Sequence, residues 1–211
     1  RTQIVSTALI HMHSKCGNID LALSEFSTMR YRDVYTYSAM IAAFAEHGKS
    51  QDAIDLFLKM QKEGLKPNQV TFIGVLNACV SSGHIEEDCR FFQIMTGVFG
   101  IEPLPEHYTC IVDLHGKAGQ LERAYDLIKQ NATCSDATTW GSLLAACRLY
   151  GNVELGEIAA RHLFEIDPED SENYVLLANT YASNDKWERA QEAKKLIGEK
   201  RMKKPSSYSS I

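Results

Sequence analysis

Short apolar stretches with helical spacing recur along the whole chain and alternate with polar breaks. In the segment 38–44 the apolar residues recur at i, i+3 and i+4, and the segment 53–60 repeats this spacing with polar residues between. Gly64 and Pro67 then mark a helix end, because glycine suits the C-terminal turn and proline cannot continue the helix. No stretch shows the sustained period-two alternation of a half-buried strand. The pattern therefore predicts helices throughout.

Six polar breaks divide the chain into helix-turn-helix units of nearly constant length. Five breaks carry a glycine, and the sixth, Asn184-Asp185, carries residues that also tolerate a turn. The glycines of the five breaks are Gly17, Gly48, Gly83, Gly119 and Gly151. Successive distances from Gly17 to Asp185 are 31, 35, 36, 32 and 34 residues. Because one such hairpin buries its apolar faces only against its neighbours, the period predicts an all-α, right-handed superhelical solenoid.

The composition allows a buried core and excludes several classes of protein. Of the 211 residues, 45% are hydrophobic and 23% are charged, which excludes a chain that is disordered by composition. The net charge of −5 excludes a strongly basic nucleic-acid-binding protein. No run of 18 apolar residues occurs, so no membrane partner is expected. The six cysteines form no C-x-x-C pair, which favours buried thiols in a reducing compartment over a disulfide framework.

The breaks and their spacing are similar to those of a known repeat family. The segment 34–41 (Val-Tyr-Thr-Tyr-Ser-Ala-Met-Ile) and the segment 64–68 (Gly-Leu-Lys-Pro-Asn) resemble the start and the end of a pentatricopeptide repeat. The order of motif lengths resembles that of plant PLS-type pentatricopeptide proteins, in which short, standard and long motifs alternate. The resemblance implies a first short motif at 3–33, a standard motif at 34–68, a long motif at 69–104 and a second short motif at 105–136.

The last third of the chain resembles the E subgroup of the same family. Residues 137–170 and 171–204 look like the two E motifs, which are similar to tetratricopeptide repeats. Residues 205–211 resemble the start of a truncated C-terminal extension, although Ser206 stands where the family has glycine. The large aromatic residues of this part are expected in the core between helices: Trp140, Tyr174 and Trp187.

The resemblance implies that the fifth and the last residue of each motif face one RNA base. These reader pairs are Thr7 with Asp33, Ser38 with Asn68, and Thr109 with Asp136. Aspartate can accept hydrogen bonds from guanine N1–H and N2–H₂, whereas the amide of asparagine suits the donor and the acceptor of adenine. The long motif offers Ile73 and Leu104, whose side chains form no hydrogen bond. The family's code then predicts single-stranded RNA with the sequence 5′-G-A-N-G-3′, upstream of an edited cytidine.

The reader residues also have a purely structural interpretation, because Ser, Thr, Asp and Asn near helix ends commonly act as caps. Three pairs at the family's spacing favour base reading over capping alone. The family also places a short apolar residue at the second position of each motif, flanking the base. Ile4 and Val70 fit this pattern, Tyr35 is bulkier but can stack, and Glu106 departs from it. The departure weakens the assignment of guanine to the second short motif.

The sequence contains no motif that supports catalysis or metal binding. His84-Ile85-Glu86 has the H-x-E form found in zinc-dependent deaminases, but no P-C-x-x-C follows it. The other histidines are scattered among different repeats, so no zinc site is predicted. Phosphate-binding glycine loops and the G-x-S-x-G elbow do not occur. We therefore expect no catalytic residue, no metal and no cofactor in this chain.

The resemblance implies part of an organellar cytidine-to-uridine RNA editing specificity factor. Its E motifs would recruit MORF/RIP-type editing proteins or a DYW-type cytidine deaminase, in cis or in trans. The implied location is the mitochondrion or the chloroplast, with the targeting segment expected upstream of residue 1. Two alternatives stay open: a protein-binding scaffold of tetratricopeptide type, and a pentatricopeptide factor in RNA splicing or stabilisation. Exposed solenoid ends would also allow a homodimer.

Overall fold

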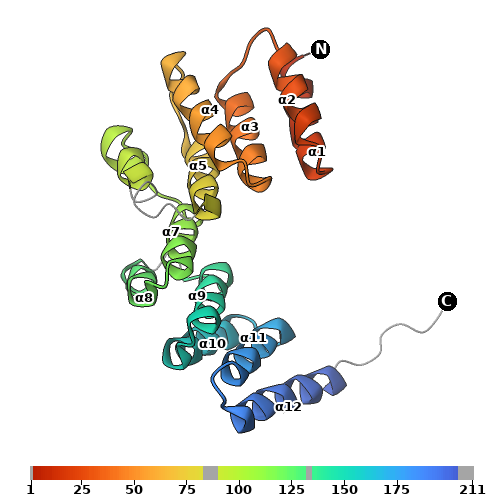
Figure 1. Cartoon of the computed structure of the whole chain (residues 1–211), viewed down its shortest axis with the longest axis vertical. Helices are drawn as coiled ribbons and strands as arrows, with labels where there is room; N and C mark the ends of the chain where they lie inside the picture. Colours follow the sequence, from red (N-terminus) through yellow and green to blue (C-terminus); the bar gives the residue numbers. More distant parts are fainter. Residues whose placement is uncertain (1, 83–89, 132–134, 204–211) are drawn as a thin grey trace, which may run out of the picture. The chain divides into compact units, whose positions relative to one another are not determined.

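The computed structural model describes residues 2–82, 90–131 and 135–203, and within these ranges every regular element is a helix (Figure 1). The helices are α1 (Gln3–Lys15), α2 (Ile19–Thr28), α3 (Val34–Glu46), α4 (Ser50–Lys62), α5 (Gln69–Ser82), η1 (Ile94–Val98), α7 (Pro105–Lys117), α8 (Leu121–Gln130), α9 (Ala137–Tyr150), α10 (Val153–Ile166), α11 (Ser171–Ala182) and α12 (Trp187–Lys203). The predicted all-α class of helix-turn-helix repeats is confirmed. The H-x-E segment 84–86 and the tail 205–211 lie outside the described residues.

The first helix of each hairpin begins where a motif was expected to begin. These helices start at Gln3, Val34, Gln69, Pro105, Ala137 and Ser171. In most cases the residue before the start is Asp, Asn or Thr, the type that caps a helix, so the local sequence accounts for the helix starts. The division of the chain into short, standard, long and E motifs stays a prediction, since helix starts do not define motif classes.

The breaks between paired helices are tight turns in the left-handed backbone region. The glycines at four breaks have φ between 69° and 76°, namely Gly17, Gly48, Gly119 and Gly151. Asp185 takes this conformation at the sixth break, with φ 58°, and no other non-glycine residue in the described ranges has a positive φ. The prediction that Asn184-Asp185 replaces a glycine turn is therefore confirmed. Aspartate tolerates this region better than most residues, but at a higher energy than glycine.

The helices form two compact units, Arg1–Leu114 and His115–Ile211, and the boundary falls within α7. In the first unit, α1 packs against α2 and α3, and α3 packs against α4 and α5 (Figure 1). Edge-to-face aromatic pairs join neighbouring hairpins: Phe26 with Tyr37, whose ring centroids are 5.2 Å apart, and Phe57 with Phe72, at 5.4 Å. The apolar core of this unit therefore runs from hairpin to hairpin, as the repeat pattern predicted.

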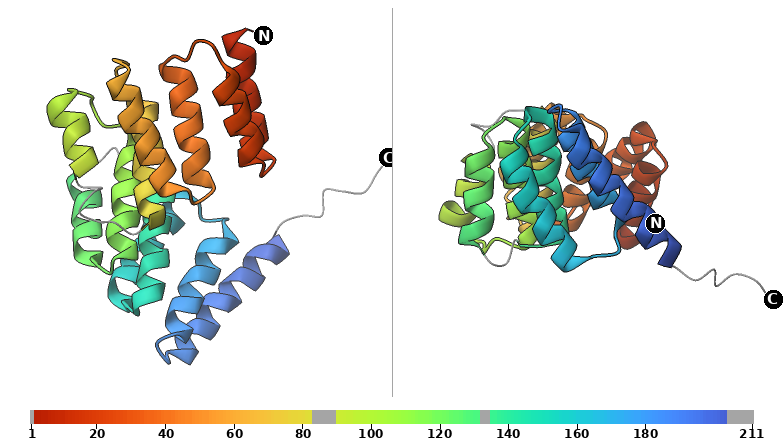
Figure 2. Two further views of the ribbon diagram at one scale, coloured as in Figure 1. Left: turned by 45° about the horizontal axis from the view of Figure 1, so that its top comes forward. Right: turned by 90° about the horizontal axis from the view of Figure 1, so that it is seen from below.

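In the second unit, α9 packs against α8, α10 and α11, and α11 packs against α12 (Figure 2). Trp140 is 2% exposed and stacks on His162 of α10, while Tyr174 is 5% exposed and stacks on Phe164. The expectation of a core position is wrong for Trp187, which is 61% exposed. It begins the last helix that the structure describes, and no further hairpin among the described residues covers it.

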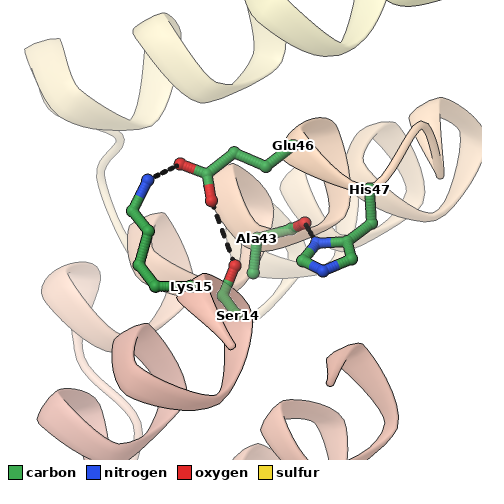
Figure 3. Close-up of polar contacts among 5 residues, drawn as sticks. All are labelled: Ser14, Lys15, Ala43, Glu46 and His47. Atoms are coloured by element: carbon green, nitrogen blue, oxygen red, sulfur yellow. Dashed lines mark hydrogen bonds and ion pairs between the residues drawn. The ribbon is translucent and has the colours of Figure 1, made fainter. Parts of the chain in front are cut away.

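A polar contact joins the C-terminal ends of α1 and α3 (Figure 3). Glu46 accepts a hydrogen bond from Ser14 at 3.1 Å and pairs with the Lys15 ammonium at 2.7 Å. Beside it, Nδ1 of His47 lies 2.8 Å from the carbonyl oxygen of Ala43. The hydrogen bond from Lys15 is the main reason why the pKa of Glu46 lies below its ordinary value; burial opposes it, and Ser14 reinforces it.

Acidification should weaken this contact between neighbouring hairpins. Because the folded pKa of Glu46 is lowered, its contribution to stability is present above the ordinary carboxyl pKa and disappears as the pH falls through the lowered value. The pair is largely solvent-exposed, so the contribution should be below about 0.5 kcal/mol. Urea unfolding of Glu46→Gln should show a smaller loss of stability between pH 6 and pH 3 than the parent, and equal losses would contradict the assignment.

The strained turn at Asp185 predicts that two substitutions change the stability of the protein in opposite directions. Asp185→Gly should stabilise the protein by about 0.5–1 kcal/mol, because glycine adopts positive φ without steric cost. Asp185→Ala should destabilise it by a similar amount, since alanine has neither the freedom of glycine nor a polar side chain that bonds locally. Urea unfolding of both variants measures the difference, and a change of the same sign in both would exclude backbone strain as the cause.

Candidate nucleic-acid interface

A surface pocket at the N-terminal ends of α1 and α3 contains the first reader pair. Its volume is about 380 Å³, within the range of small-ligand pockets. Seven residues line it: Gln3, Ile4, Thr7, Ala8, His11, Asp33 and Tyr35. Ile4 is 83% exposed and Tyr35 is 68% exposed, so two apolar side chains stand in solvent beside the polar Thr7 and Asp33. The structure thus brings together both predicted readers of the first short motif, its predicted base-flanking residue Ile4, and Tyr35, the predicted base-flanking residue of the next motif.

Asp33 caps helix α3. Its Oδ1 atom accepts hydrogen bonds from the backbone N–H of Thr36, at 2.9 Å, and from the Thr36 hydroxyl, also at 2.9 Å. Burial raises the pKa of this carboxyl, but the hydrogen bonds from Thr36 and from the Gln3 side chain outweigh it and hold the pKa below its ordinary value. Asp33 therefore carries a negative charge at neutral pH and acts only as an acceptor.

Thr36 connects Asp33 to the other reader of the pair. Its Oγ1 atom lies 3.1 Å from Oγ1 of Thr7, which is 29 residues away in the sequence and on the neighbouring first helix. Thr7 also donates to the carbonyl oxygen of Gln3 at 3.1 Å. Since Thr36 gives its proton to Asp33, the single proton of Thr7 is engaged inside the protein. Thr7 can therefore offer a ligand only the lone pairs of its hydroxyl oxygen.

The second reader pair is joined in the same way through Thr71. The Ser38 and Thr71 hydroxyl oxygens are 2.7 Å apart, and Ser38 also donates to the carbonyl oxygen of Val34 at 2.7 Å. Asn68 accepts at Oδ1 from the Thr71 backbone N–H, at 2.9 Å, and from the Thr71 hydroxyl, at 3.0 Å. An amide that accepts from a backbone N–H must turn its oxygen to it, so the NH₂ group of Asn68 faces the other way. Ser38 is only 2% exposed, whereas Val70 is 53% exposed.

The long motif lacks this polar arrangement. Ile73 and Leu104 are partly buried and apolar, and the residue equivalent to the two threonines is His107, which is fully buried. The backbone N–H of Leu104 donates to Nδ1 of His107 at 2.9 Å, so its Nε2 carries the hydrogen and donates to the carbonyl oxygen of Gln69 at 2.9 Å. His107 therefore bonds only to backbone groups in these contacts.

The third reader pair is divided between the two units. Thr109 lies on α7 in the first unit and donates to the carbonyl oxygen of Pro105 at 3.1 Å. Asp136 lies in the second unit, where it caps α9 by accepting from the Thr139 backbone N–H at 2.7 Å. The capping interpretation is thus confirmed for Asp33 and Asp136, and Asn68 makes the same type of contact.

The corresponding positions of the E motifs are arranged differently. Gly141 occupies the fifth position and offers no side chain, while Asp170 occupies the last. Both oxygens of Asp170 have a donor within the protein: Oδ1 accepts from the Glu172 backbone N–H at 2.9 Å, and Oδ2 from the Asn173 side chain at 3.0 Å. In Asp33, both bonds from Thr36 end on Oδ1, and the Gln3 side chain also donates a hydrogen bond to the carboxylate.

Sequence reasoning did not identify the threonines at the third position of three motifs or the pocket residues Gln3 and His11. A signal was present for the threonines, because Thr36, Thr71 and Thr139 recur three residues after a reader Asp or Asn. Among the residues that the structure describes, no group of three His, Cys, Asp or Glu side chains is placed to hold a metal ion. No helix in the described ranges has the length and apolar character needed to cross a membrane.

Comparison with known families covers most of the chain. Residues 32–81 match the PPR repeat family, residues 4–34 and 106–130 match the PPR repeat, and residues 150–211 match the E motif. The fold and the regularly spaced capping residues define a helical-repeat protein, and these matches specify the class. The chain belongs to the pentatricopeptide repeat family and carries an E motif after its repeats.

Curated relatives come from Arabidopsis thaliana and are longer than this chain. One pentatricopeptide repeat-containing protein is 44% identical over 98% of this chain and 32% of its own length. A mitochondrial member is 42% identical over 99% of this chain and 33% of its own, and a chloroplastic member is 43% identical over all of this chain and 39% of its own. The chain therefore spans about a third of the length of the curated relatives it matches.

Solved structures with the same fold include RNA complexes of other proteins. Maize PPR10 in complex with an 18-nt psaJ RNA element has a TM-score of 0.75 at 16% identity, over 95% of this chain and 31% of that chain. The PPR domain of Arabidopsis thaliana protein-only RNase P 1 in complex with tRNA has a TM-score of 0.63 at 17% identity, over 90% of this chain and 98% of that chain. At these identities the likeness shows the α-solenoid fold.

The cap at Asp33 predicts a stability difference between two substitutions. Asp33→Ala should lower the free energy of unfolding by about 1 kcal/mol, because the Thr36 N–H loses its acceptor. Asp33→Asn should stay within about 0.5 kcal/mol of the parent, since the amide oxygen can take over the cap. Urea unfolding of the two variants tests this difference, and equal losses would show that the cap contributes nothing.

Proposed function

We propose that this chain contributes sequence-specific recognition of single-stranded RNA to an organellar cytidine-to-uridine editing specificity factor. The observation that carries the proposal is the pocket that Thr7 and Asp33 line together with the exposed apolar side chains of Ile4 and Tyr35. A flat base fits between two apolar side chains, which contribute roughly 1–3 kcal/mol per base by stacking. The two polar groups then meet the edge of that base.

The polarity of the first pair favours guanine. Asp33 offers only acceptors, and Thr7 offers lone pairs because its proton is engaged within the protein. Among the four RNA bases, guanine alone places two donors, N1–H and N2–H₂, side by side on its Watson–Crick edge. A pair of acceptors therefore matches guanine and leaves a buried donor or acceptor unsatisfied with the other bases.

The polarity of the second pair favours adenine by a different route. Asn68 turns its NH₂ donors away from the cap, and the Ser38 hydroxyl adds an acceptor. One donor and one acceptor match the N1 and N6–H₂ groups of adenine, and cytosine has a similar pattern on a smaller ring. Because Ser38 is buried, Asn68 is expected to make the larger contribution. With guanine at the second short motif and no preference at the long motif, the proposed target remains 5′-G-A-N-G-3′.

The E motifs are assigned a different task, recruitment of the catalytic component. Asp170 has a protein donor on each of its oxygens, and Gly141 offers no reader side chain, which supports an end of base reading before this part. The match to the E motif supports association with a DYW-type cytidine deaminase, in cis or in trans, and with MORF/RIP-type proteins. Catalysis is then supplied by that component rather than by this chain.

An organellar location is supported by the relatives, two of which are named as mitochondrial and one as chloroplastic. Affinity depends on the whole protein. Three or four bases at roughly 1–3 kcal/mol each barely offset an association cost of about 4–15 kcal/mol. The net charge of −5 adds little attraction to phosphate. The test of the proposal therefore uses the full-length protein that contains this chain.

Exchange of the carboxylate for an amide at Asp33 should switch the preferred base. In Asp33→Asn the Thr36 N–H holds the amide oxygen at the cap, so the NH₂ group replaces an acceptor by donors. Binding of the full-length protein to single-stranded RNAs that end in G-A-N-G or A-A-N-G is measured by fluorescence anisotropy. The parent should prefer the first RNA by about 1–3 kcal/mol, and the variant should prefer the second. If the variant keeps the parent's preference, the pocket does not read a base.

A further inference from the structure

We infer that Thr36 and Thr71 are positioning residues that set the hydrogen-bond polarity of the two reader pairs. The inference rests on the proposed function and adds residues that contact no base themselves. Both threonines are 0% exposed, so a bound base cannot reach their hydroxyl groups. Their effect on a base must pass through the readers that they hold.

Each threonine contacts two readers. One is the capping residue three positions before it, and the other lies on the first helix of the preceding hairpin. Thr36 Oγ1 lies 2.9 Å from Asp33 Oδ1 and 3.1 Å from Thr7 Oγ1. Thr71 Oγ1 lies 3.0 Å from Asn68 Oδ1 and 2.7 Å from Ser38 Oγ. The fifth and last residues of a motif are therefore joined by one hydroxyl group that belongs to the next motif.

A cap alone does not require this hydroxyl group. The backbone N–H of Thr36 already satisfies the cap with Asp33, and a valine or alanine would present the same N–H. The hydroxyl group adds two contacts: it donates its proton to Asp33, the last residue of the motif, and its oxygen contacts the hydroxyl group of Thr7, the fifth residue. With the hydroxyl present, the Thr7 hydroxyl group has two internal partners, Thr36 and the Gln3 carbonyl oxygen; without it, the Gln3 carbonyl oxygen alone holds Thr7, and the orientation of the Thr7 hydroxyl group is less constrained.

The long motif provides a comparison within the same chain. There the readers are the apolar Ile73 and Leu104, and the equivalent position carries His107 instead of threonine. His107 bonds to backbone groups of Leu104 and Gln69 in its two contacts. Threonine thus occurs next to reader pairs with polar side chains, and another residue takes its place where both readers are apolar.

The test compares Thr36→Val with Thr36→Ser in the full-length protein. The probes are four synthetic single-stranded RNAs that differ only at the nucleotide whose preference Asp33→Asn changes, and a fifth RNA that is abasic there. Thr36→Val should lose about 3- to 10-fold of the guanine preference, the range expected for one net hydrogen bond, and should bind the abasic RNA like the parent. Thr36→Ser, which keeps the hydroxyl group, should retain the preference within about twofold.

Thr180→Val is the matched control for a buried threonine. Thr180 is also 0% exposed, and its hydroxyl donates within its own helix to the carbonyl oxygen of Leu176, at 2.9 Å. This variant should alter thermal stability without altering base preference. If Thr36→Val weakens binding to all five RNAs equally, the threonine has only a structural role and the inference is overturned. An unchanged guanine preference in Thr36→Val also overturns it, whereas an unchanged preference in Asp33→Asn contradicts the proposed function itself.

Discussion

The arrangement of the hairpins depends on one constraint: the backbone N–H groups at the start of each hairpin's first helix need hydrogen-bond acceptors. Every helix leaves its first N–H groups without an internal partner, and at four junctions that the structure describes the last residue of one motif supplies the acceptor for the first helix of the next. Asp33, Asn68, Asp136 and Asp170 all do so. The cap thus lies at the junction of consecutive hairpins, where its geometry affects both helix formation and the packing of neighbours.

Capping and base reading are usually weighed as alternatives, but in this chain the same contact can serve both. A side chain with two polar atoms can give one to the helix and keep the other for a ligand. The helix N–H selects oxygen for the cap, so aspartate leaves an acceptor and asparagine leaves donors. The local rule for helix starts therefore also specifies which hydrogen-bonding group remains available to a ligand, which in the proposed function is an RNA base.

At the junction between the two E motifs, both carboxylate oxygens of the capping aspartate are engaged within the protein. Asn173 stands where Thr36 and Thr71 stand in the repeats, and its amide occupies the second oxygen of Asp170. Stacking of the hairpins is retained, as the pairing of Phe164 with Tyr174 shows. A solenoid can thus continue its packing while the polar groups at a junction become engaged within the protein, which agrees with the proposed separation of recognition from recruitment along one chain.

Helical spacing and turn residues in the sequence were sufficient to predict the helices, the described hairpin breaks and the turn at Asn184-Asp185, because these depend on neighbouring residues; the predicted break at Gly83 lies outside the described residues. The candidate readers could be named, although only by resemblance to the family. The links from Thr36 to Thr7 and from Thr71 to Ser38 could not, since they join residues 29 and 33 positions apart that meet only when hairpins stack. Stacking likewise buried Ser38 and left Trp187 exposed, because a side chain in a solenoid is covered only where a neighbouring hairpin follows.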